Sequence, residues 1–350
     1  MTSQVPSSAL SEAIRILAGG RSLSRAESRG AFDVLMEGKA DPSEVESLLI
    51  GLRARGENAD EVAGAVDSLR AVMITVDAVQ DRLVDTCGTG GGGTPTFNIS
   101  SAASFVAAGA GVRIAKHGNR SHTTRSGSAD LFEALGIDIG LGPEEAKKVL
   151  ASVGLVFLYA PHYHPAMRHV APIRKKLGVS TIMNLVGPVA NPAHVERQVM
   201  GVFENSRGPV VAEALRQLNR KHALVMHARA GMDEISPAGE TEVWEVRSDQ
   251  VTTWMLDPKT LGLECADLTA LAGGSPAENA IRTERLLMGD AGDEAGRCAV
   301  LLNAAAAIYV SEDGLSLEMA AERARDSLAS GAAGRVLLDL RRAAPAGLPG

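Results

Sequence analysis

The first quarter of the chain alternates apolar and polar residues at helical spacing. Leu10, Ile14 and Leu17 share one face of a helix that a glycine pair at 19–20 ends. Asp41 precedes a proline and Asn58 precedes an acidic turn, so each is placed to cap a further helix. No strand pattern occurs between residues 8 and 75, and this stretch predicts a small α-helical domain.

From residue 82 onward, short apolar runs alternate with amphipathic stretches. Residues 83–85 predict a strand, followed by a glycine run, a buried helix at 100–110 and a strand at 112–115. That order is typical of a parallel α/β sheet. The same pattern continues with strands at 155–159, 198–203 and 223–227, a helix at 209–220, an antiparallel addition at 241–256, and helices at 276–289, 293–310 and 316–330.

The chain therefore predicts an α/β protein, with a small N-terminal all-α domain plus a large α/β domain whose central, mostly parallel sheet is flanked by helices. The last dozen residues are rich in Ala, Pro and Gly and predict a frayed tail. Residues 184–188 and 191–192 predict a rigid loop that joins the two lobes.

The composition limits the partners and the compartment. Hydrophobic residues make up 45% of the 350 and aromatic residues only 3%, so the core must be built from Ala, Val, Leu and Ile. A net charge of −7 argues against a nucleic-acid partner and an anionic membrane surface, because both require clustered positive charge. Three cysteines without CxxC spacing, no signal peptide and no apolar run of membrane length predict a cytoplasmic protein.

Five of the six residues from 88 to 93 are glycine, directly after a predicted strand. Each costs about 0.5–1 kcal/mol in backbone entropy relative to alanine, so such a run indicates that a ligand approaches the backbone closely. The loop feeds a helix near Asn98, whose N-terminus adds partial positive charge, and together they predict a phosphate site. The run matches neither the dinucleotide motif nor the P-loop, and a flexible surface loop is the alternative.

A second polar cluster follows the strand at 112–115. Lys116, Arg120 and Arg125 are cations suited to charge-assisted hydrogen bonds with phosphate oxygens. Several hydroxyl side chains lie between and after them, and Ser128 opens another helix. Because open α/β sheets bind ligands at the carboxyl ends of their strands, this cluster predicts a second part of the anion site, with a solvated polar turn as the alternative.

Asp233 and Glu234 are adjacent in a loop that follows the strand at 223–227. Mg²⁺ prefers one or two carboxylates together with substrate phosphates and retained waters, so the pair predicts a magnesium site. A solvated acidic turn is the alternative.

Arg174 stands beside an apolar helical stripe formed by Ala166, Val170, Ile173 and Leu177. A planar carboxylate is the best partner for its guanidinium, and an ordinary surface arginine is the alternative. No Ser/His/Asp or Cys/His arrangement stands out, so the sequence identifies no covalent nucleophile and no dedicated general base. A reaction driven by metal, charge and positioning needs neither.

Taken in order, these segments resemble the anthranilate phosphoribosyltransferase family over nearly the whole chain. The resemblance is carried by GTGG at 88–91, TFNIS at 96–100, KHGNRS at 116–121, SGSADLFEALG at 126–136, HPAMRHVAPIRKKLG at 164–178, NLVGPVANP at 184–192 and GMDEIS at 231–236. It implies a nucleoside phosphorylase-like phosphoribosyltransferase fold, a homodimer, and transfer of the phosphoribosyl group of phosphoribosyl diphosphate (PRPP) to the amine of anthranilate in tryptophan biosynthesis. It also implies a small domain of residues 1–76, completed by helices around 165–190, and a large PRPP-binding domain of residues 77–164 and 191–345.

The resemblance further implies the binding residues. Anthranilate would contact Gly88, His117, Asn119, Arg174, Gly187 and Pro188, and Mg²⁺ would bind Ser100, Asp233 and Glu234. The residues that would contact PRPP are Gly88, Gly91, Gly92, Thr96, Asn98, Ile99, Ser100, Ser101, Lys116, His117, Gly118, Asn119, Arg120, Ser121, His122, Thr123, Thr124 and Ser128.

One position departs from the family pattern. The family usually reads GTGGDG, whereas this chain has Gly92 in place of the aspartate. That aspartate would lie beside the diphosphate and ribose, so its loss implies altered PRPP affinity rather than lost activity. The alternatives are a pyrimidine-nucleoside phosphorylase-like enzyme, a non-catalytic nucleic-acid-binding relative, and transfer to another aromatic acid; the acidic pair and the low pI of about 5.7 disfavour the first two.

Overall fold

The computed structural model describes residues 8–90, 96–121 and 125–346. Seven strands form one sheet in the order β3-β2-β1-β4-β5-β6-β7. The first five strands are parallel, and β6 and β7 extend the sheet in antiparallel fashion. The strands are β1 (Leu83–Gly88), β2 (Arg113–Gly118), β3 (Leu155–Tyr159), β4 (Arg197–Gly201), β5 (His222–Ala228), β6 (Thr241–Arg247) and β7 (Gln250–Leu256).

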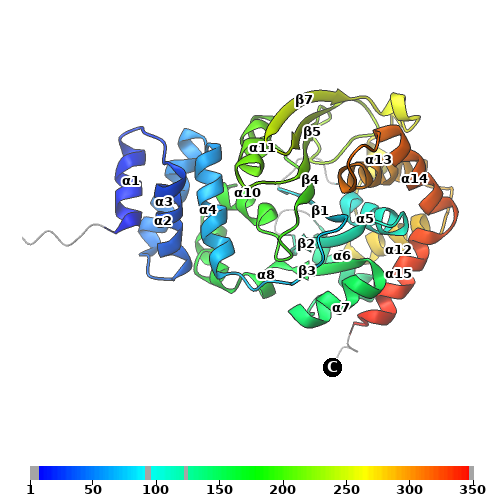
Figure 1. Ribbon diagram of the computed structural model, residues 1–350, viewed down its shortest axis with the longest axis horizontal. Helices are drawn as coiled ribbons and strands as arrows, with labels where there is room; N and C mark the ends of the chain where they lie inside the picture. The colour runs from blue at the N-terminus through cyan, green and yellow to red at the C-terminus, as the bar shows by residue number, and fades with distance from the viewer. Residues whose placement is uncertain (1–7, 91–95, 122–124, 347–350) are drawn as a thin grey trace, which may run out of the picture.

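Four helices precede the sheet and form one end of the elongated molecule (Figure 1). They are α1 (Ala9–Ala18), α2 (Arg25–Met36), α3 (Pro42–Arg55) and α4 (Ala59–Val72). Both predicted caps are present, because the Asp41 side chain accepts from the Ser43 amide and the Asn58 side chain accepts from the Glu61 amide. The buried face of α1 consists of Leu10, Ala13 and Ile16, whereas Ile14 and Leu17 are only partly buried. The buried face of the helix is therefore rotated relative to the predicted one.

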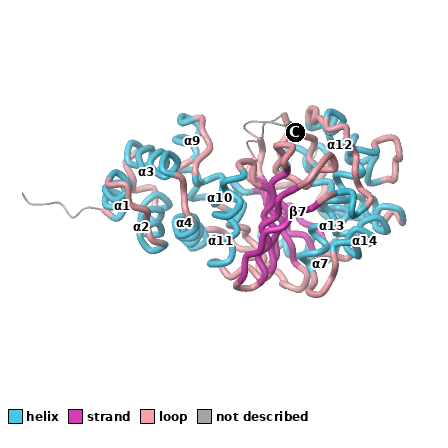
Figure 2. Tube along the Cα trace, turned by 90° about the horizontal axis from the view of Figure 1, so that it is seen from above, coloured by secondary structure: helices cyan, strands magenta, loops and turns pink. Residues whose placement is uncertain are grey.

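Helices cover both faces of the sheet, as the view in Figure 2 shows. One face packs against α5 (Ile99–Gly109) and α13 (Glu294–Ser311), and the other packs against α10 (Ile182–Val189) and α11 (Gly208–Gln217). The remaining helices are α6 (Ser128–Ala134), α7 (Pro143–Val153), α8 (Ala160–Tyr163), α9 (Ala171–Leu177), α12 (Pro276–Leu287), α14 (Leu317–Ala329), α15 (Ala332–Ala343), and the short 3₁₀ turns Pro165–His169, Asn205–Arg207, Pro258–Leu261 and Thr269–Leu271.

The central helix α5 is packed through small side chains. It is built mostly of alanine and serine, and the facing run 304–307 of α13 is four buried alanines. At its far end, a Cβ on Gly109 would lie 2.7 Å from the amide nitrogen of Ala333 on α15. The low aromatic content of the chain therefore corresponds to helices that approach one another closely.

Three predictions about local structure are wrong. Residues 184–188 form most of helix α10 instead of a loop, because the Gly187-Pro188 pair falls in the last turn, where the proline displaces one hydrogen bond only. The stripe from Ala166 to Leu177 is buried or packed on the core, but it is divided between a 3₁₀ turn and α9. The expected tail instead contains the end of α15, where Leu340 is fully buried.

Helix α10 packs against α3 and α4, and helix α9 packs against α3. On that ground we propose the division into a small domain of residues 1–76 with 165–190 and a large domain of residues 77–164 with 191–345. None of the helices within the described ranges combines the length and the apolar character needed to cross a membrane.

The crossing of α2 and α4 gives a test of this packing. A Cβ on Gly64 of α4 would lie 2.3 Å from the carbonyl oxygen of Arg25, so Gly64→Ala should overpack the crossing by about 1–3 kcal/mol. That cost outweighs the gain of about 1 kcal/mol in helix propensity. We expect a lower midpoint of thermal unfolding for Gly64→Ala. Gly51→Ala in α3 is the matched control, because its Cβ would meet nothing closer than 3.5 Å, and it should not lower the midpoint.

Candidate active site

The carboxyl ends of the parallel strands carry an acidic turn. Gly88 ends β1 and is paired in register with Gly201, which ends β4. A Cβ on Gly201 would lie 1.5 Å from the carbonyl oxygen of Asp233, and one on Gly88 would lie 2.6 Å from Asp233 Oδ2. The turn of Asp233 and Glu234 therefore lies directly on the strand ends, at a distance that only glycine allows.

Both carboxylates of this turn face the glycine loop. The amide of Gly90 donates to Asp233 Oδ2 at 3.2 Å, and Thr96 Oγ1 donates to Glu234 Oε2 at 3.1 Å. Burial raises the pKa of both carboxyl groups, and the neighbouring Asp233 charge raises the pKa of Glu234 further. The acidic turn and the loop after β1 are therefore in direct contact, and burial disfavours the ionised form of both carboxyl groups.

Lys116 on β2 is a cation whose charge acts on Glu234 of this turn. Its side chain is 1% exposed, and Nζ donates to the carbonyl oxygen of Thr86 at 2.5 Å and lies 3.3 Å from Ser100 Oγ. Burial lowers the pKa of Lys116, and the charges of Asp85 and Glu234 oppose that shift. Lys116 thus lies beneath the start of α5, on the face of the sheet that α5 covers.

The next residue, His117, points to the opposite face of the sheet because successive strand residues alternate. Its ring is buried and lies 5.0 Å from the ring of His164, measured between centroids. Burial lowers the pKa of both imidazoles, that of His164 to about 4, so both rings are neutral at pH 7. The His117 amide donates to Asp85 Oδ1 at 3.1 Å.

The loop after β2 is brought against the starts of α5 and α6. Ser128 Oγ donates to the carbonyl oxygen of Asn119 at 3.3 Å, and a Cβ on Gly118 would lie 2.1 Å from the same hydroxyl. The side chain of Asn98 makes no cap on α5 and instead bonds to Ser126, at 3.1 and 3.2 Å, and to Asn279 at 2.9 Å. The first amides of α5 therefore have no capping side chain from Asn98, which suits an anion at that position.

Two of the predicted phosphate cations already have acidic partners. Arg120 bonds to Asp130 at 2.9 Å and to Glu133 at 2.5 Å, while the exposed Arg125 lies 3.8 Å from Glu278. Ser121 is held through its amide, which donates to Asp130 at 3.3 Å. The charge of Lys116, in contrast, acts on Glu234 of the acidic turn.

Some of the remaining predicted residues are buried in the core, and the others are partly exposed. Ile99 and Ser101 are buried in the core, so only their backbone atoms can reach a ligand at the start of α5. Arg174 on α9 is half-buried and lies 3.4 Å from Asn184 Oδ1, and burial lowers its pKa. Gly187 and Pro188 are partly exposed on α10. Five predicted residues lie outside the described ranges: Gly91, Gly92, His122, Thr123 and Thr124.

A cavity of about 220 Å³ adjoins the glycine loop where the N-terminal helices meet the sheet domain. Thr89 and Gly90 line it from the loop, and Arg53, Glu57, Glu204 and Arg207 line it from the two sides. Arg53 pairs with Glu204 at 2.7 Å, and Arg207 pairs with Glu57. Ion pairs thus connect the two parts of the molecule next to the loop.

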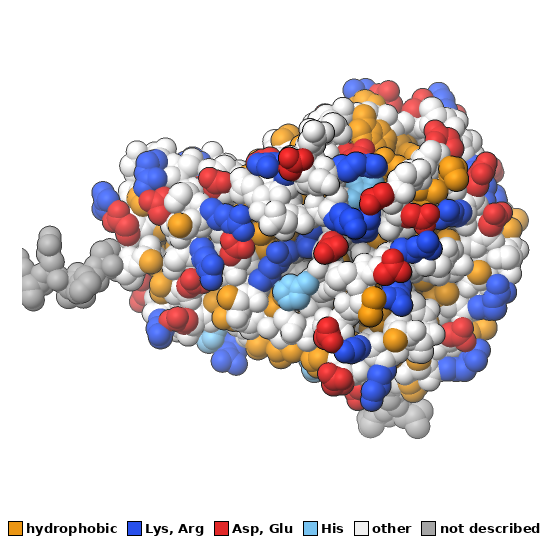
Figure 3. All heavy atoms as spheres, in the orientation of Figure 1, with side chains coloured by type: hydrophobic (Ala, Val, Ile, Leu, Met, Phe, Trp, Pro, Cys, Tyr) orange, Lys and Arg blue, Asp and Glu red, His pale blue; other side chains and the backbone are white. Residues whose placement is uncertain are grey.

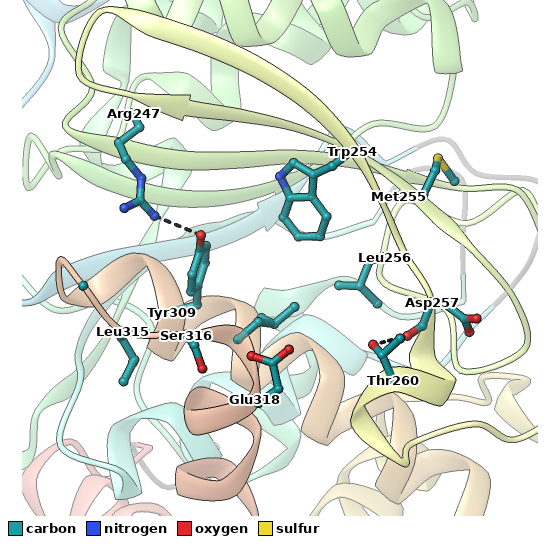
Figure 4. A pocket seen from close by; sticks show the side chains of 12 residues that line it. Arg247, Trp254, Met255, Leu256, Asp257, Thr260, Tyr309, Leu315, Ser316 and Glu318 are labelled. Atoms are coloured by element: carbon teal, nitrogen blue, oxygen red, sulfur yellow. Dashed lines mark hydrogen bonds between the residues drawn. The ribbon is translucent and has the colours of Figure 1, made fainter.

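A larger cavity of about 540 Å³ lies elsewhere, between β7 and the start of α14 (Figure 4). Arg247 donates to the Tyr309 hydroxyl at 2.9 Å, and both this arginine and the Trp254 indole donate to Glu245 at 2.9 Å. These polar groups already bond to one another, so they are not available to a ligand in the larger cavity. We therefore place the candidate active site at the glycine loop.

Comparison with known proteins places the chain in a family. The model described as "Glycosyl transferase family, a/b domain" matches residues 80–334, and the model described as "Glycosyl transferase family, helical bundle domain" matches residues 11–73. The anthranilate phosphoribosyltransferase of Symbiobacterium thermophilum is 44% identical over 328 residues, which cover 94% of this chain and 96% of that protein. The chain belongs to the anthranilate phosphoribosyltransferase family.

Solved structures of the anthranilate phosphoribosyltransferase family have the same fold. The enzyme from Thermus thermophilus superposes with a TM-score of 0.87 at 39% identity, covering 94% of this chain and 99% of that one. The enzyme from Saccharomyces cerevisiae, solved in complex with PRPP and Mg, superposes with a TM-score of 0.88 at 30% identity, covering 95% and 97%. The predicted helical N-terminal domain, the large α/β domain and the family resemblance are thereby confirmed.

The family motifs did not point to several residues that hold this site together. Asp85, Gln198 and Asn279 are buried polar side chains that bond to predicted site residues, and Gly201 admits the acidic turn. Asp85 carries one readable signal, a carboxylate inside an apolar strand, which is uncommon without a buried partner.

On the face drawn in Figure 3, positive and negative side chains are intermixed, so that face has no continuous basic surface of the kind a nucleic-acid partner requires.

The raised pKa of Glu234 predicts a pH-dependent gain in stability for Glu234→Gln in buffer free of divalent metal. Because the folded-state pKa lies above the unfolded value, ionisation destabilises the folded protein above the folded pKa, and the penalty disappears below the unfolded value of about 4.3. We expect the variant to be more stable than the parent near pH 9, by on the order of 1 kcal/mol or more, and close to the parent near pH 4, just below the unfolded value. Thermal unfolding at both pH values measures this.

The exposed Glu144→Gln is the control and should show no such difference. A Glu234→Gln protein that is less stable than the parent at pH 9 would show that its carboxylate is compensated within the fold.

Proposed function

We propose that this chain transfers the 5-phosphoribosyl group of PRPP to the amine of anthranilate, giving N-(5-phosphoribosyl)anthranilate and diphosphate in tryptophan biosynthesis. The observation that carries the proposal is the contact between the glycine loop and the acidic turn, where Gly90 bonds to Asp233 and Thr96 bonds to Glu234. A loop of backbone amides beside two partly uncompensated carboxylates suits a diphosphate that arrives with a divalent cation. Membership of the anthranilate phosphoribosyltransferase family supports the same reaction.

We propose Mg²⁺ as the cofactor, held by Asp233, Glu234 and Ser100. The raised pKa of both carboxyl groups fits a cation at this position, since a bound cation stabilises their ionised forms. Within the described ranges no cluster of three or more His, Cys, Asp or Glu side chains is placed to hold a metal by itself, which suits an ion that completes its shell with water and phosphate oxygens. When bound, Mg²⁺ neutralises charge on the departing diphosphate.

The protein's own groups then bind and orient PRPP. Amides of the glycine loop and of the uncapped start of α5 donate to phosphate oxygens, and Lys116 supplies a buried positive charge beneath them. Hydrogen bonds join Thr96 to Glu234 of the acidic turn, Asn98 to the carbonyl oxygen of Ser126, and Ser128 to the carbonyl oxygen of Asn119, so these proposed PRPP residues are held in one group. We propose that this group fixes the ribose with its C1 directed toward the opposite side of β2.

We propose that anthranilate binds on the His117 side, with Arg174 and Asn119 holding its carboxylate and Gly187 and Pro188 lining the approach. The aromatic amine is neutral at pH 7, so it attacks the ribose C1 as diphosphate departs, without a strong general base. The neutral, buried imidazole of His117 suits a wall of this pocket, since burial lowers its pKa. The transition state gains oxocarbenium character at C1, which nearby negative charge stabilises.

The proposed partners are the two small-molecule substrates and a second copy of the chain in a homodimer. Sedimentation velocity measures the oligomeric state.

The reaction itself is tested by mixing protein, PRPP and MgCl₂ with anthranilate and following the loss of anthranilate fluorescence. We expect a loss that depends on all three components and stops on addition of EDTA. Unchanged fluorescence with or without metal would refute the proposed function.

Arg174→Ala should raise the KM for anthranilate by about tenfold or more, because a charge-assisted bond to a carboxylate is worth about 1.5–3 kcal/mol. The KM for PRPP should change little. Lys175→Ala is the control, because this neighbouring side chain is exposed. A defect confined to the PRPP side would reject the assignment of Arg174.

Gly92→Asp restores the carboxylate that the family pattern has at this position. We expect a lower KM for PRPP, because the added carboxylate would orient the diphosphate and ribose through the cation. Steady-state kinetics at fixed MgCl₂ compare the variant with the parent. If KM and kcat were both unchanged, position 92 would have no part in tuning the site.

A further inference from the structure

A polar group interrupts the apolar face of the sheet that lies under α10. Along this face Cys87, Met200 and Val225 pack in the cluster shared with the N-terminal helices. Asp85 on β1 and Gln198 on β4 are directly opposite each other in register, so both side chains emerge on this same face. Both are fully buried. Buried polar side chains on an otherwise apolar surface are costly unless they hold something in place.

Gln198 contacts both helix α10 and strand β1. Its Nε2 donates to the carbonyl oxygen of Pro188 at 2.8 Å, and the same nitrogen lies 3.5 Å from Asp85 Oδ2. Because the carbonyl and the carboxylate are both acceptors, only the NH₂ group of Gln198 can face them. The other oxygen of Asp85 accepts from the amide of His117 at 3.1 Å. A chain of contacts therefore runs from Pro188 through Gln198 and Asp85 to His117.

Side chains from other elements donate hydrogen bonds to the last carbonyl groups of α10. The last carbonyls of a helix have no partner within the helix. Here the carbonyl of Val189 accepts from Arg70 at 3.0 Å and from Arg220 at 2.8 Å, and that of Pro188 accepts from Gln198. The charges of the buried Arg220 and the half-buried Arg70 match the negative end of the helix dipole. Gln198 is the member of this set that also reaches the strand carrying His117, through Asp85.

We propose that Gln198 is a positioning residue for the acceptor substrate: it fixes the spacing between the Pro188 wall on α10 and the His117 wall on β2. The inference rests on the proposed function, which assigns anthranilate to the space between these walls. It adds a residue that contacts neither substrate and sets the width of the pocket. Lys116, the cation proposed for PRPP, lies on the other face of the sheet, where it reaches Thr86 and Ser100, so the loss of the Gln198 amide should affect PRPP much less than anthranilate.

Gln198→Met tests the proposal, because methionine keeps the length of the side chain and removes the amide. We expect the KM for anthranilate to rise about fivefold or more, with the KM for PRPP within about twofold of the parent value. Met200→Leu is the matched control on the same strand and the same buried face, and both KM values should stay at parent values. If Gln198→Met does not fold, Gln198→Asn takes its place, since its amide falls one methylene short of Pro188, and the same split is expected.

Each outcome has one meaning. An unchanged KM for anthranilate in whichever variant folds would overturn the role of Gln198. An equal rise in both KM values would also overturn it, because a general loosening of the fold would not distinguish the substrates. Failure of the proposed function would appear separately, as a parent protein that consumes no anthranilate in the presence of PRPP and MgCl₂.

Discussion

The acidic turn fits against the sheet only because β1 and β4 both end in glycine. A side chain on Gly201 would occupy the position of the Asp233 carbonyl, and one on Gly88 would touch its carboxylate. This close approach places two carboxylates beside the backbone amides of the glycine loop, where burial raises the pKa of both. The raised pKa of the acidic pair, and the suitability of the pair for the proposed cation, follow from a constraint on volume at the strand ends.

The second organising feature is the alternation of side chains at the end of β2. Lys116 points toward α5 and the start of the phosphate loop, and His117 points toward α10 and His164. In the proposed site, this strand supplies a charged group to the donor side and a neutral ring to the acceptor side. A shift of one residue in the pairing of β2 would exchange them, so the register of the sheet sets the side that each group faces.

Much of the fold could be predicted from the sequence because its signals are local. Caps at Asp41 and Asn58, a glycine run after a strand, and apolar runs of strand length are each decided by a few neighbouring residues. The glycine loop and the acidic turn were also recognisable, because their chemistry lies in adjacent residues. Local signals failed at α10, where a Gly-Pro pair is tolerated in the last turn, and at α15, where burial of Leu340 overrides an Ala- and Pro-rich composition. Gln198 and Asn279 had no local signal at all, since their roles depend on residues far away in the chain.

The packing of α5 has a consequence for how this enzyme family can vary. The helix begins at Ile99, beside the proposed phosphate site, and ends at Gly109, about 15 Å away at 1.5 Å per residue, where it is in tight contact with α15. Packing through alanine and glycine leaves few side-chain atoms that could rearrange to accept added volume. Larger side chains on α13 or α15 should therefore shift the whole of α5, including its start, even though they lie far from the proposed active-site residues.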